Sequence, residues 1–375
     1  TFSACSEDMG IDSTCHGVTT YNAQGSGTRA DPYRICNAAS LASIGATSSA
    51  WNKNFKLKHS LDLSAYTQTA DGTQWIPIGT SATPFSAHFD GNRRTIDNFT
   101  YTDLNKDYVA LFGYVKGGRA EIRDLTVSDV SISGNSYTAA VAGYLDLGKI
   151  INVSVSGGVN ADSAYTGGLV AYINGGLVGE VKNSAAVTST ANYVGGIAGI
   201  VDSSGGIINS YNTGSVRGGV YVGGISGDLS GYLNNVYNSG NIVGTSFRIG
   251  GINGRSSGVA SNSFSTGNVI GVSASGTSVG VLVGQNSGSW ENSFYSTSAV
   301  VTNTGSGNVT NTTGGTGVSL DNFYYSTNAP LTSWNVSDTW KSSGTSLPTL
   351  EPNLLSSSWG DCSCLLYTSD AADEE

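Results

Sequence analysis

Small residues recur in this chain at a nearly constant interval, and that period restricts the fold more than any other feature of the sequence. Successive intervals are 30, 28, 28, 28, 27 and 30 residues. Periods of about 20 to 50 residues are typical of solenoids and propellers, but a propeller blade needs about 40 residues. The period therefore favours a solenoid. The repeat positions are Gly113, Gly143, Ala171, Gly199, Gly227, Gly254 and Gly284.

Within one period, the residue types predict short strands separated by turns. Residues 193–201 alternate apolar side chains with glycine, residues 202–206 form a polar turn, and residues 207–211 are again largely apolar. A third short strand is expected at residues 215–217. Such a unit is one turn of a coil, called a rung below. The chain is therefore predicted to be all-β: a right-handed parallel β-helix, or β-solenoid, of about seven or more rungs of 27–30 residues with an irregular N-terminal cap.

Stacked rungs place equivalent residues above one another at the strand spacing of about 4.8 Å. Two aromatic columns and one amide column are therefore expected. A sugar could stack on the first aromatic column, which supplies the candidate binding residues, but packing of repeated rings on one another is the simpler explanation. The first column contains Tyr137, Tyr165, Tyr193 and Tyr221; the second contains Tyr211, Tyr237, Phe264 and Phe294; the amide column contains Asn152, Asn183, Asn209, Asn235, Asn262 and Asn292.

The pattern also divides the chain into regions. A short helix is expected near residues 38–44, a strand at 75–79, and a turn between two strands at 90–92. The final residues resemble the translation of a sequencing adapter and are expected to be a non-native tail. The regions are an N-terminal Cys-containing cap (1–50), entry strands (51–107), the repeat solenoid (108–326), an irregular C-terminal region (327–364) and the tail (365–375).

Composition and charge exclude several classes of function. The chain has 52 glycines among 375 residues and only 12% charged residues, so Ser, Thr, Asn and Gly form its polar surface. A net charge of −10 disfavours a nucleic-acid partner, since phosphate binding needs clustered Lys and Arg. No apolar run reaches the roughly 18 residues of a membrane-spanning segment. No cofactor is expected.

The cysteines lie only at the two ends of the chain. The first three permit one disulfide in three alternative pairings, which favours an oxidising compartment. Their spacing matches no zinc site, so no metal is expected. The cysteines are Cys5, Cys15 and Cys36 before the repeats, and Cys362 and Cys364 after them.

The repeats resemble a known family. Residues 195–199 read Gly-Gly-Ile-Ala-Gly and residues 223–227 read Gly-Gly-Ile-Ser-Gly, each followed by Asn-x-Tyr. Together with Thr-Gly-x-Val at 213–216 and 266–269, they look like GLUG-motif repeats, which occur in bacterial adhesins and in non-catalytic regions of IgA-cleaving peptidases. The preceding segment is similar to the module that introduces such repeats; its marks are residues 27–35, 61–63, 75–79, 89–92 and 108–113.

That resemblance implies a secreted or cell-surface module for adhesion or ligand display, and it carries over no catalytic residue. The implied partners are a host or matrix glycan or protein, and other domains of the same full-length protein. A passive stalk of a larger peptidase or adhesin is the alternative use of the same fold.

A search for catalytic residues supports the same interpretation. The histidines, His16, His59 and His88, form no His-Glu-x-x-His motif. Two Gly-x-Ser-x-Gly matches, at 254–258 and 276–280, are expected by chance in a chain so rich in Gly and Ser. The chain is predicted not to be an enzyme.

The main alternative is a β-helix polysaccharide lyase or glycoside hydrolase, which would need paired carboxylates. Asp202 and Asp228 are expected in equivalent turns of neighbouring rungs, although solvated turn residues are the commoner explanation. Four further aspartates lack the spacing of a calcium-binding loop: Asp103, Asp107, Asp124 and Asp129.

Overall fold

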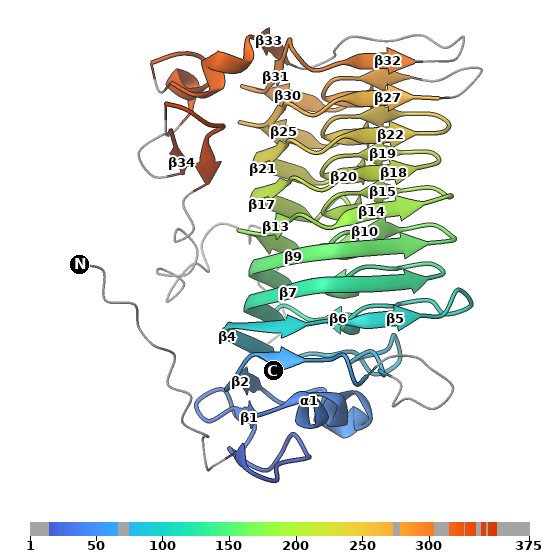
Figure 1. The fold of residues 1–375 in the computed structure, drawn as a ribbon, viewed down its shortest axis with the longest axis vertical. Coiled ribbons are helices and arrows are strands. Elements are labelled where there is room, and N and C mark those ends of the chain that lie inside the picture. The colour runs from blue at the N-terminus through green and yellow to red at the C-terminus, as the bar shows by residue number, and fades with distance from the viewer. Residues whose placement is uncertain are drawn as a thin grey trace, which may run out of the picture.

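The computed structural model is a β-solenoid, in which short parallel strands stack rung upon rung into a rod (Figure 1). Three parallel sheets run along it, with 21, seven and five strands. The seven-stranded sheet receives one strand from each rung, so the predicted all-β solenoid of about seven rungs is confirmed. The structure describes residues 15–66, 75–272, 278–303, 315–325, 327–334, 339–342 and 344–350.

The two smaller sheets lie side by side in each rung, connected through a glycine-rich bend. The seven-stranded sheet contains β6 (Phe112–Lys116), β8 (Ala142–Asp146), β11 (Val170–Asn174), β16 (Ala198–Val201), β20 (Ser226–Leu229), β24 (Asn253–Ser256) and β29 (Val283–Asn286). The five-stranded sheet contains β10 (Thr166–Gly167), β15 (Val194–Gly195), β19 (Val222–Gly223), β23 (Ile249–Gly250) and β28 (Val279–Gly280).

The largest sheet covers the rest of the coil, with one long strand or two to three short strands per rung. It contains β1 (Tyr33–Ile35), β2 (Phe55–Leu57), β3 (Leu61–Asp62), β4 (His88–Asp97), β5 (Thr100–Thr102), β7 (Glu121–Gly134), β9 (Lys149–Ala161), β12 (Leu177–Gly179), β13 (Lys182–Asn183), β14 (Ala186–Ser189), β17 (Gly206–Asn212), β18 (Val216–Gly218), β21 (Tyr232–Asn238), β22 (Ile242–Gly244), β25 (Val259–Ser261), β26 (Phe264–Ser265), β27 (Val269–Gly271), β30 (Ser289–Glu291), β31 (Phe294–Ser296), β32 (Val301–Asn303) and β33 (Thr316–Val318).

Outside the three sheets the described elements are short. They are α1 (Ala38–Gly45), the 3-10 helices η2 (Ser48–Ala50), η3 (Leu320–Phe323) and η4 (Leu331–Ser333), and an antiparallel pair of β34 (Trp340–Lys341) and β35 (Thr349–Leu350). No helix in these described parts of the chain is long and apolar enough to cross a bilayer.

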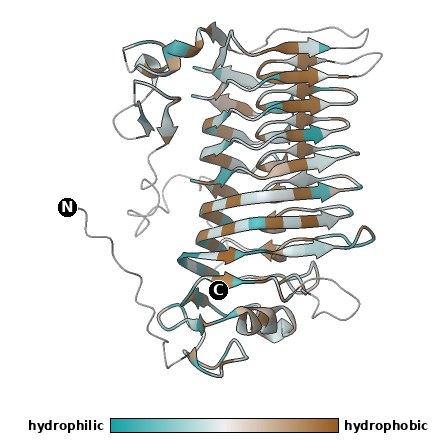
Figure 2. Ribbon diagram, viewed as in Figure 1, coloured by the Kyte–Doolittle hydropathy of each residue, from teal (hydrophilic) through white to brown (hydrophobic). Residues whose placement is uncertain are grey.

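The core consists of aliphatic side chains stacked from rung to rung. Ile173, Val201 and Leu229 follow one another in register on β11, β16 and β20, and all three are fully buried. The opposite wall repeats this arrangement on the largest sheet, and the apolar positions form aligned bands across the strands (Figure 2). Each such side chain contributes about 1.5–3 kcal/mol by leaving water.

A column of left-handed residues turns the chain within the largest sheet. Asn209, Asn235, Asn262 and Asn292 have φ of 48°, 53°, 50° and 45°, which asparagine tolerates better than most residues. The Asn235 amide donates to Asn209 Oδ1 at 3.0 Å, so these two members of the predicted amide column are hydrogen-bonded. Asn152 belongs to this column, with φ 54°.

The prediction that Asn183 belongs to this amide column is wrong. Its rung has Glu180 at the left-handed position, next to Gly179, which pairs with Ile208. Asn183 instead pairs with Asn212 and belongs to a second, buried amide ladder with Asn238. The prediction failed because both columns lie at closely spaced positions of the same rung.

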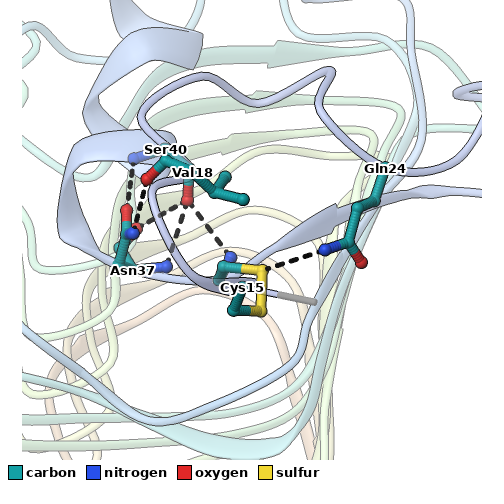
Figure 3. Close-up of a disulfide and its surroundings, with 6 residues drawn as sticks. Cys15, Val18, Gln24, Asn37 and Ser40 are labelled. Carbon is teal, nitrogen blue, oxygen red and sulfur yellow. Dashed lines mark hydrogen bonds between the residues drawn. A yellow bond between two sulfur atoms is a disulfide. The ribbon is translucent and has the colours of Figure 1, made fainter. Parts of the chain in front are cut away.

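A disulfide and a capped helix hold the N-terminal region together. Of the three pairings left open by the sequence, the structure contains Cys15–Cys36, while Cys5, Cys362 and Cys364 lie outside the described residues. The predicted helix is α1, whose N-cap Asn37 accepts from Ser40 N at 2.9 Å. The Asn37 amide also donates to Val18 O, which ties the disulfide loop to the helix (Figure 3).

Two expectations for the entry region were wrong. Residues 75–79 form no strand in their described part; only Ile78 makes an isolated bridge, to Phe112. The expected turn at 90–92 is a bend within the single strand β4, where Asn92 and Arg93 are left-handed and the register with β7 shifts. A parallel neighbour, β7, holds β4 on both sides of the bend, so the chain continues forward instead of reversing.

The C-terminal described residues pack beside the rod, against the second aromatic column. Tyr211, Tyr237 and Phe264 stack at 4.6 and 4.7 Å between ring centroids. Trp334 lies 5.5 Å from Phe264, and its indole nitrogen donates to Asn292 O at 2.9 Å. Tyr237, Phe264 and Phe294 of this column are therefore buried, and Figure 1 shows the C-terminal elements beside β21 and β31.

Candidate ligand-binding face

The first predicted column of tyrosines is present on the outside of the solenoid. Tyr137, Tyr165, Tyr193 and Tyr221 stack in order, with 4.7, 5.3 and 4.7 Å between successive ring centroids. Tyr108 extends the column by one ring at 4.6 Å from Tyr137. All five side chains are half-buried. The rings therefore pack on one another, as the simpler explanation required, while remaining partly accessible.

Every tyrosine of this column has a left-handed backbone. Their φ values are 60°, 56°, 67°, 62° and 58°, a conformation that bulky side chains rarely adopt. Repeated glycines permit it. A Cβ at Gly227 would lie 2.6 Å from Tyr221 O, and one at Gly199 would lie 2.8 Å from Tyr193 O. The glycine period and the tyrosine period thus arise from one crossing of the chain in each rung.

A third aromatic column, which the sequence reasoning missed, lies beside the first. Tyr114, Tyr144 and Tyr172 occupy equivalent positions of β6, β8 and β11 and stack at 4.7 and 4.8 Å. Rings of the two columns approach to between 5.7 and 6.3 Å. Each of these tyrosines directly follows a residue of the small-residue repeat, a signal that could have identified the column.

The two columns together form a continuous surface, called the tyrosine face below. Successive rings within a column are nearly parallel, at 5° for Tyr108 and Tyr137 and 7° for Tyr144 and Tyr172. The ring planes inside each column are therefore covered by neighbours, and edges and hydroxyls are what a ligand can reach. The tyrosine face comprises Tyr108, Tyr114, Tyr137, Tyr144, Tyr165, Tyr172, Tyr193 and Tyr221.

The packing raises the pKa of several phenols of this face. Burial, together with the neighbouring phenols, raises the pKa of Tyr137 to about 12. Burial also raises the pKa of Tyr144 and of Tyr193. At neutral pH the face therefore offers neutral hydroxyls that both donate and accept hydrogen bonds. A sugar ring cannot lie on the covered ring planes, so recognition here relies on hydroxyls and ring edges.

One end of the face changes from aromatic to charged. In the first column, Arg248 follows Tyr221 with the same left-handed backbone, φ 61°. Its guanidinium lies 4.8 Å from the Tyr221 ring centre, donates to the Tyr221 hydroxyl at 2.6 Å, and donates to Gln285.

In the third column, that of Tyr114, Tyr144 and Tyr172, the position after Tyr172 is held in turn by Ile200, Asp228 and Arg255. Arg255 pairs with Asp228 through two hydrogen bonds, one of them Nε to Oδ1 at 2.8 Å, and lies 4.9 Å from the Tyr221 ring centre. The Asp228 bond raises the pKa of Arg255.

The two aspartates proposed for catalysis are not equivalent. Asp228 lies in β20 opposite Ile200, whereas Asp202 follows the end of β16 in a turn. Asp228 is 4% exposed, and its carboxylate forms an ion pair with Arg255. The expectation of equivalent turns was wrong because Asp228 follows Gly227 by one residue and lies inside β20, whereas Asp202 follows Gly199 by three residues and lies past the end of β16. Burial and the Asp202 carboxylate raise the pKa of Tyr172, so both aspartates border the face.

Other chemical candidates from the sequence lie apart. Ser256, in the first Gly-x-Ser-x-Gly match, is fully buried within strand β24, and the second match falls partly outside the described residues. Asp124 is paired with Arg123 at 2.7 Å. His88 contacts Glu121 at 3.1 Å. Within the described residues no three His, Cys, Asp or Glu side chains gather as metal ligands would.

Comparisons with known proteins agree with the fold. No known family's sequence profile matches the chain. A solved structure from Bacteroides ovatus, provisionally named an immunoglobulin A1 protease, superposes with a TM-score of 0.59 at 22% identity, over 87% of this chain and 94% of that one. At that identity the likeness establishes the β-solenoid alone.

Two curated proteins are similar over part of the chain. Halomucin of Haloquadratum walsbyi is 33% identical over 124 residues, which is 32% of this chain and 1% of halomucin. A protein of Evansella cellulosilytica, provisionally named a Gly-rich membrane protein, is 33% identical over 135 residues, 36% of this chain and 15% of that protein. The chain thus corresponds to a small part of each of these relatives.

Proposed function

We propose that this chain is a non-catalytic, surface-displayed β-solenoid module that binds an extended polymer, a glycan or a protein, along its tyrosine face. The observation that carries the proposal is the pair of adjacent tyrosine columns, half-exposed and continuous over consecutive rungs. A rigid row that presents one or two hydroxyls per rung suits a ligand with its own repeat. It suits a compact small molecule less well.

The backbone of the first column supports a binding role. Bulky residues in the left-handed region cost of order 1–3 kcal/mol each, and such residues gather at functional sites. Here five successive tyrosines adopt that conformation. Asparagine at the same positions would form the turn with less strain, as it does in the amide column. The tyrosines therefore contribute something other than the turn.

Placement at the cell surface is supported by two features. Disulfides such as Cys15–Cys36 persist in oxidising compartments. The similar regions of halomucin and of the Gly-rich membrane protein point the same way. The implied adhesive use of GLUG-motif repeats is the basis for choosing glycans and matrix proteins as the ligands to test.

The test is retention on immobilised polysaccharides and extracellular-matrix proteins. A triple variant, Tyr144→Phe, Tyr165→Phe and Tyr172→Phe, keeps the stacked rings and removes three hydroxyls. At about 0.5–1.5 kcal/mol for each lost hydrogen bond, affinity should fall about tenfold or more. Tyr237→Phe, in the aromatic column that the C-terminal region covers, is the matched control and should bind normally. Equal binding by the triple variant would refute the use of this face.

Two other functions give different results in the same assay. A polysaccharide lyase or glycoside hydrolase would release product from a retained glycan, and Asp202→Ala or Asp228→Ala would abolish that release. A passive stalk would retain no ligand at all. The Arg255 pairing of Asp228 favours the binding module over the enzyme, because the guanidinium bonds to both carboxylate oxygens and leaves them less available to a substrate.

A further inference from the structure

We propose that the Arg248 end of the tyrosine face is a carboxylate-binding subsite, and that the ligand class is therefore an acidic polysaccharide with carboxylated sugar units. This inference rests on the proposed binding function and adds the ligand's charge and its position on the face. The basis is Arg248, which occupies the position that tyrosines hold in the preceding rungs of the first column.

Arg248 is held in place while retaining free donors. Its Nε bonds to Gln285, one Nη bonds to the Tyr221 hydroxyl, and the guanidinium plane rests over the Tyr221 ring. Three fixed contacts order a side chain that would otherwise lose about 2 kcal/mol of rotamer entropy on binding. A guanidinium has five N–H donors, so donors remain for a planar carboxylate, which it can bind in a fork.

The other cations beside the face are neutralised. Arg255 pairs with Asp228, and Lys116 pairs with Asp146 at 2.8 Å. Among the described residues Arg248 makes no ion pair. Three charged side chains lie at the Tyr221 end of the face, namely Arg248, Arg255 and Asp228, and their charges sum to one positive unit. The chain's net charge of −10 does not cancel it, since charges beyond about 8 Å are screened at physiological salt.

The position of Arg248 selects a polymer over a free acid. Val222 pairs in register with Ile249, so Arg248 directly continues the line of Tyr193 and Tyr221 hydroxyls. A chain lying along that line would place sugar hydroxyls on the tyrosines and a carboxylate on the arginine. A protein ligand with acidic side chains would be a different class, and it is one outcome of the test.

The experiment compares two forms of one polymer, with the carboxyl groups either free and charged or methyl-esterified and neutral. Binding of the full chain to polygalacturonate and to its methyl-esterified form is measured by affinity electrophoresis, at low and at physiological salt. The wild-type chain should prefer the free acid about tenfold, and added salt should reduce that preference. Arg248→Gln should remove the preference, whereas Arg248→Lys should keep part of it.

Controls separate the subsite from the proposed function. Arg217→Gln removes an exposed charge on β18, in the largest sheet, and should change nothing. The thermal midpoint of Arg248→Gln should match wild type, which excludes misfolding. Equal binding of both polymers, or a preference that survives Arg248→Gln, overturns the subsite. If the esterified polymer still binds and the triple tyrosine variant loses it, the binding face stands without the subsite. Retention of acidic proteins but of neither polymer also overturns the inference.

Discussion

At the scale of single residues, the tyrosine face joins an unfavourable backbone to a favourable environment. The left-handed φ of 56° is unfavourable for Tyr137. Its ring, however, stacks on the rings of Tyr108 and Tyr165, with centroid distances of 4.6 and 4.7 Å. Stacked aromatic pairs contribute about 0.5–1.5 kcal/mol beyond their buried area. Two such contacts per ring offset a backbone strain of comparable size. Each ring of the column therefore depends on its neighbours for stability.

That packing predicts a stability loss in alkali. The unfolded chain loses the Tyr137 phenolic proton near pH 10, whereas the folded chain keeps it until about pH 12. The raised pKa therefore contributes stability that is fully present below pH ~10 and is lost as the pH rises through 12. Denaturation midpoints recorded between these pH values should fall, and less steeply in Tyr137→Phe. An identical slope in both proteins would contradict the stacked, half-buried phenol.

The glycine column gives a second residue-scale prediction. A Cβ at Gly227 would lie 2.6 Å from both Tyr221 O and Val194 N, and both atoms belong to fixed backbone. Overpacking of this kind costs about 1–3 kcal/mol, so Gly227→Ala should lower the thermal midpoint by several degrees. Ala171, the natural alanine of the same column, provides the matched control: Ala171→Gly should have a smaller effect. Equal midpoints for Gly227→Ala and wild type would argue against the close crossing.

At the scale of elements, the period of the sequence was informative because each rung needs a small residue at the same crossing. Gly199 and Gly227 mark that crossing, so counting them predicted the rungs and the Tyr193–Tyr221 stack. Within a rung the prediction was coarser. The expected strand at 193–201 is two strands, β15 and β16, because the chain bends at the intervening residues to enter another sheet.

The column of Tyr114, Tyr144 and Tyr172 is marked more weakly in the sequence, although each tyrosine follows a small-residue repeat position. It spans three rungs, after which the position is held by Ile200, an aliphatic residue, and then by Asp228 and Arg255. A pattern that ends after three repeats looks like chance in one sequence. Its meaning depends on the neighbouring column, which only the fold brings within ring-contact distance.

The buried amide ladder makes an element-scale prediction. Asn212 accepts from Asn183 and donates to Asn238, both at 2.8 Å, and its amide also donates to Gly214 O. Asn212→Ala would leave buried polar atoms unpaired on both neighbouring rungs, at about 1–3 kcal/mol each. We expect a clear loss of unfolding free energy in urea. Asn234→Ala, on the outer side of the same sheet, should cost far less, and comparable losses would show that the ladder adds nothing.

At the scale of the whole molecule, stability is distributed along the rod because each rung contacts only its neighbours. The lateral C-terminal region is an exception. It packs against Tyr237, Phe264 and Phe294 from different rungs and so bridges several of them at once. Its removal would expose an aromatic column while leaving the inter-rung hydrogen bonds of the sheets in place.

This arrangement predicts local rather than global loss of order when the bridge is broken. Trp334 is 5% exposed, lies 4.8 Å from Trp340, and bonds to Asn292 O, so Trp334→Ala should cost the lateral region about 3–5 kcal/mol. Hydrogen exchange should then quicken in the described residues between 320 and 350 and remain slow in β16 and β20. Tyr325→Ala, at a 48% exposed side chain of the same region, should leave both unchanged. Faster exchange throughout the rod would mean instead that the lateral region and the rungs unfold as one cooperative unit. The stability of the tyrosine face would then depend on a segment outside that face.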